Sequence, residues 1–205
     1  MKKIKKKRKL VIGITGGFGT GKSTVASFLR SKGFGVFDAD RIAHETLQAT
    51  HPVFQKICEK FPEAMTNGFL DRSRLADAVF KSPKKLKRLE RLIHPYVMKR
   101  LMAEIKKCKK KFIAIEVPLL FEAGFHKISD LVLVVNASIP DSEKRLVAQG
   151  WTRTEIKRRR RAQWPMHKKM ARADFVVHNA GSKAETKQQV QNFLKSLTEK
   201  NNRGN

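Results

Sequence analysis

The chain has 205 residues, of which 40% are hydrophobic, and 45 Lys and Arg against 18 Asp and Glu give it a net charge of +27. This length favours one core with a small inserted subdomain over two independent domains. The two cysteines, Cys58 and Cys108, exclude a disulfide framework or cysteine-rich zinc site, and the apolar stretches are too short for a membrane-spanning helix, so we expect a soluble, cytoplasmic protein.

The first nine residues form a basic arm, with Lys or Arg at most positions from 2 to 9. Together with the overall charge, the arm predicts attraction to polyanions. No aromatic residues alternate with the basic ones, which favours a solvated tail over a dedicated nucleic-acid-binding arm. We expect weak, nonspecific polyanion binding, no specific nucleic-acid partner and no membrane partner. The sequence carries no signal for an oligomeric state.

An apolar, β-branched run over residues 10–14 leads into Gly16-Gly17-Phe18-Gly19-Thr20-Gly21-Lys22-Ser23-Thr24. Two glycines separated by four residues and followed by Lys and Ser are the P-loop pattern. Apolar residues then recur at helical spacing until Gly33, so a strand, a loop and a helix follow in the required order. Glycines let backbone N–H groups turn toward a triphosphate. The residues predicted to bind ATP are Gly17, Gly19, Thr20, Gly21, Lys22, Ser23 and Thr24.

Two side chains of this loop have distinct expected roles. Lys22 is expected to reach the β- and γ-phosphates as a catalytic group, and the hydroxyl of Ser23 is expected to hold Mg²⁺. The sequence therefore predicts ATP and Mg²⁺ as ligands.

Residues 35–37 read as a short second strand that leads into two carboxylates, Asp38 and Asp40. Ligands of open α/β sheets gather beyond the carboxyl ends of the strands. Asp40 is therefore a candidate general base or metal-shell ligand. The alternative is that one of the two carboxylates caps a helix that begins near Arg41.

Residues 41–110 read as a mostly helical insertion between strands. The breaks between its helices are predicted at Pro52, Asn67-Gly68, Ser82-Pro83 and His94-Pro95. An apolar stripe that most simply forms core runs through Leu86, Leu89, Ile93, Val97, Leu101 and Ile105. His94 has two interpretations, as a ligand contact or as a loop histidine with a local hydrogen bond.

Three further strands are predicted over residues 112–118, 131–135 and 175–177. Their nearly continuous apolar character is typical of parallel strands that are buried on both faces, and the alternation of strands with helices predicts a parallel sheet. Residues 119–122 combine apolar bulk with a second acid, Glu122. This composition suits either a wall of a substrate pocket or ordinary packing.

Residues 153–172 are dense in basic side chains and resemble a mobile lid. An arginine that closes over the γ-phosphate would help phosphoryl transfer, in which positioning and charge neutralisation lower the barrier. Most of these cations are expected on a solvated helix face, with one or two of them reaching ATP. Trp151 and Trp164 are expected to anchor the ends of the lid.

These motifs together resemble the bacterial dephospho-coenzyme A kinases nearly from end to end. Besides the P-loop, the resemblance rests on Asp38-Ala39-Asp40, Leu92-Ile93-His94-Pro95, Glu116-Val117-Pro118-Leu119-Leu120-Phe121-Glu122, Arg161-Ala162-Gln163 and the segment 173–181. It implies ATP-dependent phosphorylation of the ribose 3′-hydroxyl of dephospho-coenzyme A, the last step of coenzyme A biosynthesis, with ATP and dephospho-coenzyme A as small-molecule partners.

The resemblance also implies an α/β, three-layer P-loop kinase fold with a parallel five-stranded sheet, a helical acceptor-binding insertion and a lid. The expected parts are a basic arm over residues 1–9, a core over 10–40, 111–144 and 173–205, the insertion over 41–110 and the lid over 145–172.

For the site, the resemblance implies that Asp40 orients the acceptor hydroxyl and takes its proton. The acceptor side is expected to comprise Thr15, Asp40, His94, Glu116, Pro118 and Leu120. The family usually carries an arginine shortly before the lid helix, and this chain lacks it in residues 147–151. Arg145, Arg153 and Arg161 are the replacements considered, and Arg161 is favoured because it lies beside Gln163 in a matching motif.

Two other functions are open to such a sequence. A nucleoside monophosphate kinase shares the P-loop and the lid, but the motifs at 92–95 and 116–122 argue against it. A nucleic-acid-binding ATPase is favoured by the net charge of +27. Against it, we find no obvious apolar strand that ends in a Walker B aspartate, although Glu116 resembles one in position. Phosphorylation of a small acceptor without nucleic acid separates these alternatives.

Overall fold

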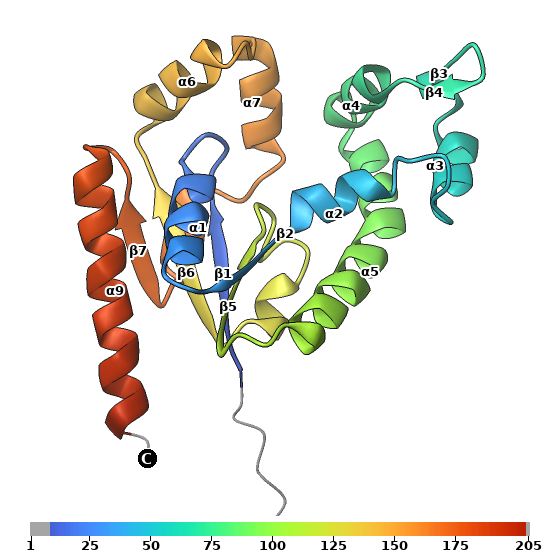
Figure 1. Cartoon of the computed structure of the whole chain (residues 1–205). Coiled ribbons are helices and arrows are strands. Elements are labelled where there is room, and N and C mark those ends of the chain that lie inside the picture. Colours follow the sequence, from blue (N-terminus) through green and yellow to red (C-terminus); the bar gives the residue numbers. More distant parts are fainter. Residues whose placement is uncertain (1–8, 204–205) are drawn as a thin grey trace, which may run out of the picture.

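The computed structural model describes residues 9–203, with side chains described up to residue 197, and its centre is a parallel sheet (Figure 1). All but the last residue of the expected basic arm lies outside the described part. The sheet contains β1 (Leu10–Gly16), β2 (Gly35–Asp38), β5 (Phe112–Glu116), β6 (Leu131–Asn136) and β7 (Phe175–His178), in the order β2-β5-β1-β6-β7. All pairings are parallel, which confirms the predicted five-stranded sheet.

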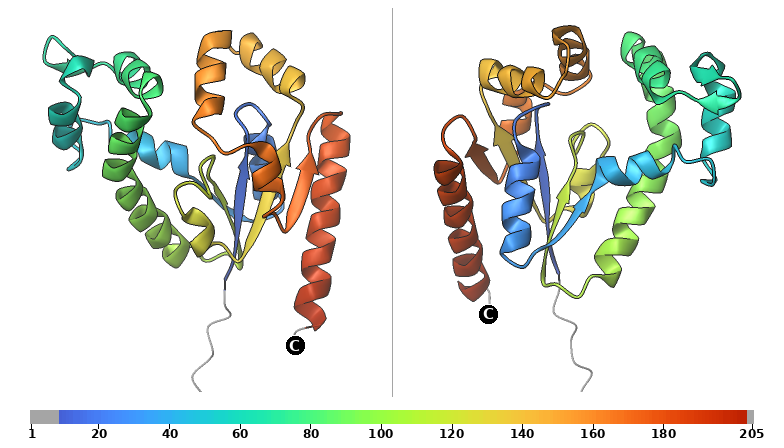
Figure 2. Two further views of the ribbon diagram at one scale, coloured as in Figure 1. Left: turned by 180° about the vertical axis from the view of Figure 1, so that it is seen from behind. Right: turned by 45° about the horizontal axis from the view of Figure 1, so that its top comes forward.

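Alternate residues of the strands feed two separate hydrophobic cores. On β1, Val11 packs into one core while Ile12 and Ile14 pack into the other, as the two-residue period of a strand requires. Helices α1 (Lys22–Ser31) and α9 (Lys183–Arg203) cover one face of the sheet, and α5 (Pro83–Lys107) and α8 (Met166–Met170) cover the opposite face (Figure 2). The three-layer α/β prediction is therefore confirmed.

The order of the strands fixes where a ligand can bind. From the central β1, one half of the sheet extends through β5 to β2 and the other extends through β6 to β7. Such a switch point leaves a crevice at the carboxyl ends of the strands. The glycine-rich loop occupies this position, because it directly follows β1 and leads into α1.

The insertion is mostly helical, as predicted, and it also contains a small hairpin. It comprises α2 (Ala39–Glu45), α3 (Phe54–Lys60), the 3₁₀ helix η1 (Pro62–Ala64), β3 (Met65–Thr66), β4 (Phe69–Leu70), α4 (Arg72–Lys81) and α5. Asn67 and Gly68 connect the two short strands with φ angles of 50° and 81°, the left-handed backbone of a tight hairpin turn. The sequence analysis had identified this turn but not the strands.

The prediction of a break at His94-Pro95 is wrong. Both residues lie inside the 25-residue helix α5. A proline in a helix interior costs about 3 kcal/mol through a lost hydrogen bond and a steric clash. The burial of Ile93, Val97 and Leu101 along the same helix face outweighs this cost. His94 is therefore a helix residue, and the interpretation as a loop histidine no longer applies.

The remaining chain supplies two helices above the sheet. Helices α6 (Ile139–Ala148) and α7 (Arg153–Arg161) follow β6, and the 3₁₀ helix η2 (Phe125–Ile128) lies between β5 and β6. Arg145 belongs to α6, which begins before the expected lid. Helix α7 starts with a capping box between Thr152 and Glu155, which satisfies two otherwise unpaired donors. Within residues 9–203, no helix has the length and apolar character needed to cross a membrane.

Candidate active site

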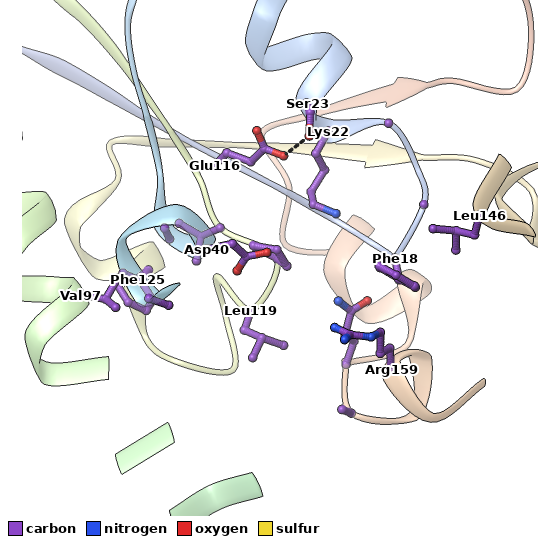
Figure 3. Close-up of a pocket in the computed structure, with 18 of the residues that line it drawn as sticks. Phe18, Lys22, Ser23, Asp40, Val97, Glu116, Leu119, Phe125, Leu146 and Arg159 are labelled. Atoms are coloured by element: carbon purple, nitrogen blue, oxygen red, sulfur yellow. Dashed lines mark hydrogen bonds between the residues drawn. The ribbon is translucent and has the colours of Figure 1, made fainter. Parts of the chain in front are cut away.

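A cavity of about 740 Å³ lies beside the glycine-rich loop. Its walls come from the P-loop, the start of α2, helix α5, the loop after β5 and the two lid helices. Figure 3 shows Lys22, Ser23, Asp40 and Glu116 on the core side of this cavity, whereas Arg159 enters from the lid. Residues from distant parts of the sequence therefore converge on one space.

The P-loop is held in shape by contacts that exclude larger residues. Gly21 has a φ of 88°, and a Cβ there would lie 2.0 Å from Nδ2 of Asn179. That amide donates a hydrogen bond of 2.8 Å to the carbonyl of Thr20. The hydroxyl of Thr20 in turn donates to the carbonyl of Gly17 over 3.0 Å. Gly17 and Thr20 thus shape the loop, while Gly19, Gly21, Ser23 and Thr24 line the cavity.

Lys22 begins helix α1, and its side chain reaches back under the loop. Its Nζ donates a hydrogen bond of 2.9 Å to the carbonyl of Gly17. Burial lowers the pKa of this lysine, although Glu116 and Asp40 act in the opposite direction. The ammonium group is thus poorly hydrated and faces two carboxylates, which suits it to binding anionic phosphates.

The two aspartates after β2 have separate roles. Oδ1 of Asp38 accepts hydrogen bonds from the backbone N–H groups of Asp40 at 2.8 Å and Arg41 at 3.2 Å. Asp38 is therefore the N-cap of α2, as the capping alternative anticipated. The carboxylate of Asp40 is left to face the cavity. Burial, and next the charge of Asp38, raise the pKa of Asp40, and Lys22 opposes them.

Glu116 lies at the position where the sequence analysis compared it with a Walker B aspartate. It ends β5, which pairs with the P-loop strand in a register that places Glu116 beside Ile14. Its Oε1 accepts a hydrogen bond of 2.8 Å from the hydroxyl of Ser23 (Figure 3). Burial raises the pKa of Glu116. The pairing of β5 with β1, rather than any local spacing, brings Glu116 to the hydroxyl of Ser23.

The half of the cavity away from the P-loop is largely apolar. Its lining includes Leu86, Leu89, Ile93, Val97, Leu119 and Phe125, so part of the stripe expected as pure core also faces the cavity. His94 lines this half as well, with its ring 6.0 Å from that of Phe125. Burial lowers the pKa of His94, which favours a neutral imidazole in this wall.

Four of the six residues expected on the acceptor side meet in the cavity, namely Asp40, His94, Glu116 and Pro118. The other two lie behind the wall. Leu120 is fully buried in the core, and the hydroxyl of Thr15 donates a hydrogen bond of 3.0 Å to the carbonyl of Pro118. These two residues support the loop after β5 and do not line the cavity.

A buried ion pair that the sequence analysis missed holds the same loop. Lys169 on α8 is fully buried, and its Nζ lies 2.9 Å from Oε1 of Glu122 and donates to the carbonyl of Pro118 over 2.7 Å. Glu122 also accepts a hydrogen bond of 2.7 Å from the backbone of Trp164. The lid's end is thus tied to the cavity wall, and Glu122 acts in packing.

The lid arginine in the cavity is not the expected one. The guanidinium of Arg159 packs against the rings of Phe18, Phe80 and Trp151 at 5.5, 4.6 and 4.4 Å from their centroids. It lines the cavity together with Arg145, which donates to the carbonyl of Asn179 over 2.8 Å.

Arg161 is exposed and lies outside this cavity. Two residues advance a helix by about 200°, so Arg161 and Arg159 point to nearly opposite sides of α7. The sequence did contain a signal that favours Arg159. Ile156 is the one apolar residue of α7 and marks the buried face of the helix. Arg159 follows it by three positions and therefore lies on the same face.

Comparisons with known proteins show which sequences and folds this chain is similar to. A family model described as dephospho-CoA kinase matches residues 10–185. A dephospho-CoA kinase of Enterococcus faecalis is 39% identical over 189 residues, which are 90% of this chain and 95% of the relative. A crystal structure from Thermus thermophilus is 38% identical with a TM-score of 0.82, over 93% of this chain and 98% of that one. A shikimate kinase of Acinetobacter baumannii shares the fold at a TM-score of 0.54 and 12% identity, over 95% and 96% of the two chains.

Proposed function

The chain belongs to the dephospho-coenzyme A kinase family, from which we infer that it uses ATP to phosphorylate dephospho-coenzyme A in the final step of coenzyme A biosynthesis. We propose that the acceptor is the ribose 3′-hydroxyl and that the reaction takes place in the cytoplasm. The observation that carries the proposed chemistry is the placement of Asp40 between a phosphate-binding loop and an apolar wall within one cavity.

Asp40 is the proposed general base. A base must reach the proton that it removes and must be ionised at the working pH. Asp40 faces the cavity on the same side as Lys22, and its pKa is raised by burial, which makes it a better proton acceptor than an exposed aspartate. Asp38 cannot take this role as easily, because its Oδ1 is engaged by two backbone N–H groups.

The cations around the loop are proposed to hold the transferred phosphoryl group. Lys22 reaches it from the core, and Arg159 and Arg145 reach it from the lid. Arg159 replaces the originally favoured Arg161. Its guanidinium is oriented by three aromatic rings, so little side-chain freedom is lost when it meets an anion.

Ser23 and Glu116 are the proposed holders of Mg²⁺. A hydroxyl and a carboxylate in contact offer the hard oxygen ligands that this ion prefers, and Mg²⁺ is usually bound by one or two carboxylates together with substrate phosphates. When bound, Mg²⁺ would offset the negative charge of the phosphates.

The two ends of the cavity suit different parts of the substrates. Asn179, Gly181 and Lys183 line the end beside the P-loop and α6, which we assign to the nucleoside of ATP. The apolar wall formed by α5 and Phe125 is assigned to dephospho-coenzyme A, whose adenine ring and pantetheine arm offer apolar surface.

The proposed function is tested by incubating the purified chain with Mg²⁺, ATP and dephospho-coenzyme A. The mass of the product and the position of the new phosphate by nuclear magnetic resonance are the readouts. We expect one added phosphoryl group at the 3′-hydroxyl. A folded, ATP-binding protein that leaves this acceptor untouched, or that hydrolyses ATP only when nucleic acid is added, would refute the assignment.

Substitution of Arg159 distinguishes it from its neighbour on the same helix. We expect Arg159→Ala to lower kcat about 10²–10³-fold, the range found when one donor to a developing negative charge is removed. Arg161→Ala is the matched control, with the same residue type and change of charge on the same helix, and should change kcat less than about threefold. Steady-state kinetics of both variants decides the matter. A larger loss with Arg161→Ala would restore the original assignment.

The pH dependence of kcat/KM follows from the directions of two pKa shifts. Asp40 must be ionised to act as the base, and its pKa is raised. The rate should therefore fall on acidification at a pH above the ordinary aspartate pKa of about 3.9. Lys22 must be protonated, and its pKa is lowered. As the pH rises, the rate should therefore fall a second time, at a pH below the ordinary lysine pKa of about 10.4.

The variant Asp38→Asn tests this assignment of the acidic limb. Asn retains the capping group of α2 and removes the charge that helps to raise the pKa of Asp40. We expect the acidic limb to move to lower pH. An unmoved limb in a folded variant would mean that neither Asp40 nor Glu116, whose pKa Asp38 also raises, controls it.

A further inference from the structure

The basic residues of helix α7 are divided between two faces. Arg159 points into the cavity, and Arg158 contacts Asp77 of α4 at 3.3 Å. The other four cations are Arg153, Lys157, Arg160 and Arg161. Lys157 is four residues from Arg153 and from Arg161 and three residues from Arg160, and these spacings place the four along one helix face. The dense basic run of the lid is thus two sets of charges with different surroundings.

The second set lines a depression of its own, which we call the outer lid site. It has a volume of about 360 Å³ and is bounded by Glu143, Arg153, Lys157, Arg160 and Arg161. None of these five residues lines the cavity of the active site. The outer lid site is therefore a separate, concave place on the molecule, between α6 and α7.

One side of this site is fixed by hydrogen bonds. Arg160 donates to the hydroxyl of Ser142 over 2.7 Å and to the carbonyl of Ile139 over 3.2 Å, and it lies 3.3 Å from Glu143. Its side chain is only 23% exposed. Arg160 is thereby fixed in place and contributes its positive charge to the depression, while its Nη2 donors are already engaged by Ser142 and Ile139.

The charges of the outer lid site are not balanced within the described part of the chain. Glu143 is the one carboxylate, and it is shared by Arg153 at 3.4 Å and Arg160 at 3.3 Å. The side chains of Lys157 and Arg161 have no ion pair or hydrogen bond with any described residue. Like charges one turn apart on a helix repel each other and destabilise it. A bound anion would remove this repulsion.

We propose that the outer lid site binds a small anion with two or three linked phosphate groups. Arginine forks match phosphate oxygens, and four cations against one carboxylate call for a ligand with several negative charges. The concave shape, with all five residues around one depression, fits a compact anion better than an extended polymer, which needs a long and open basic surface.

Calorimetric titration with inorganic pyrophosphate tests the proposal. The full chain is used without nucleotide, in metal-free buffer of low salt, and Lys22→Met is used beside it to remove the P-loop ammonium group. We expect one saturable pyrophosphate site per Lys22→Met chain, at the outer lid site, and a second site in the unaltered chain, at the P-loop. Addition of Lys157→Glu/Arg161→Glu to Lys22→Met should weaken the remaining binding at least tenfold. Both positions are exposed, so the variant should unfold at a temperature close to that of the unaltered chain.

The matched control is Lys106→Glu/Lys107→Glu, which changes the net charge equally at two exposed positions near the end of α5. It should keep the affinity within about twofold. Equal weakening by both double variants would reduce the effect to nonspecific attraction by the positive chain and overturn the proposal, as would a lack of saturable binding. A single-stranded oligonucleotide is the last comparison. If it bound the unaltered chain more tightly than pyrophosphate does, and if Lys157→Glu/Arg161→Glu abolished that binding, the outer lid site would be a surface for a nucleic-acid polymer and the proposal of a small anion would be wrong.

Discussion

Asp40→Asn should lower kcat for dephospho-coenzyme A about 10²–10⁴-fold, the usual contribution of a positioned general base. The amide keeps the size of the side chain but cannot take the proton of the acceptor hydroxyl. Asp40 lies in the cavity with Lys22 and Glu116, and no described hydrogen bond engages its carboxylate. Steady-state kinetics at saturating ATP and acceptor, together with equilibrium binding of ATP, measures the effect, and ATP binding should change little.

The neighbouring Asp38→Asn is the control for this experiment. It makes the same chemical change two residues away, at a position whose observed contacts are the capping hydrogen bonds to Asp40 and Arg41. A loss of kcat below about tenfold is expected at neutral pH. If Asp40→Asn retained near-normal turnover while Asp38→Asn did not, the two aspartates would have to exchange roles.

The backbone of this protein follows from its sequence because the relevant signals are local. The apolar runs that became β1, β5, β6 and β7 each precede a recognisable turn or helix start, and the P-loop pattern fixes the first strand, loop and helix together. The exception at Pro95 has a physical reason. The helix stop inferred from proline is local, whereas the packing of Ile93, Val97 and Leu101 that continues the helix is tertiary.

The geometry of the site was harder to predict from the sequence than the fold was, because it depends on contacts between elements that are distant in the sequence. The motif containing Glu116 was recognised, but its contact with Ser23 follows from the pairing of β5 with β1. The choice between Arg159 and Arg161 depends on the rotation of α7 relative to the sheet. The ion pair of Lys169 with Glu122 joins residues 47 positions apart in sequence, counted from their numbers, and no spacing rule predicts such a pair.

Lys22→Met should remove most of the activity without disrupting the fold, and the stability of the folded protein should be unchanged or higher. The substitution deletes the ammonium group expected to meet the phosphates, and we expect kcat/KM for ATP to fall at least about 10²–10³-fold. Without nucleotide, the same ammonium is buried with a lowered pKa, and its hydrogen-bond partner is the carbonyl of Gly17. Methionine fills similar space without this desolvation. The thermal unfolding temperature of the nucleotide-free variant should therefore be unchanged or higher.

Lys169→Met is the matched control, because Lys169 is a second buried lysine whose pKa is also lowered by burial. Its ammonium is paired with Glu122 at 2.9 Å, so its removal leaves a buried carboxylate without its charge partner. Breaking such a pair costs about 3–5 kcal/mol, and the unfolding temperature should drop. The two lysines are thus expected to respond in opposite directions, and a destabilised Lys22→Met would indicate that Lys22 serves the fold rather than the nucleotide.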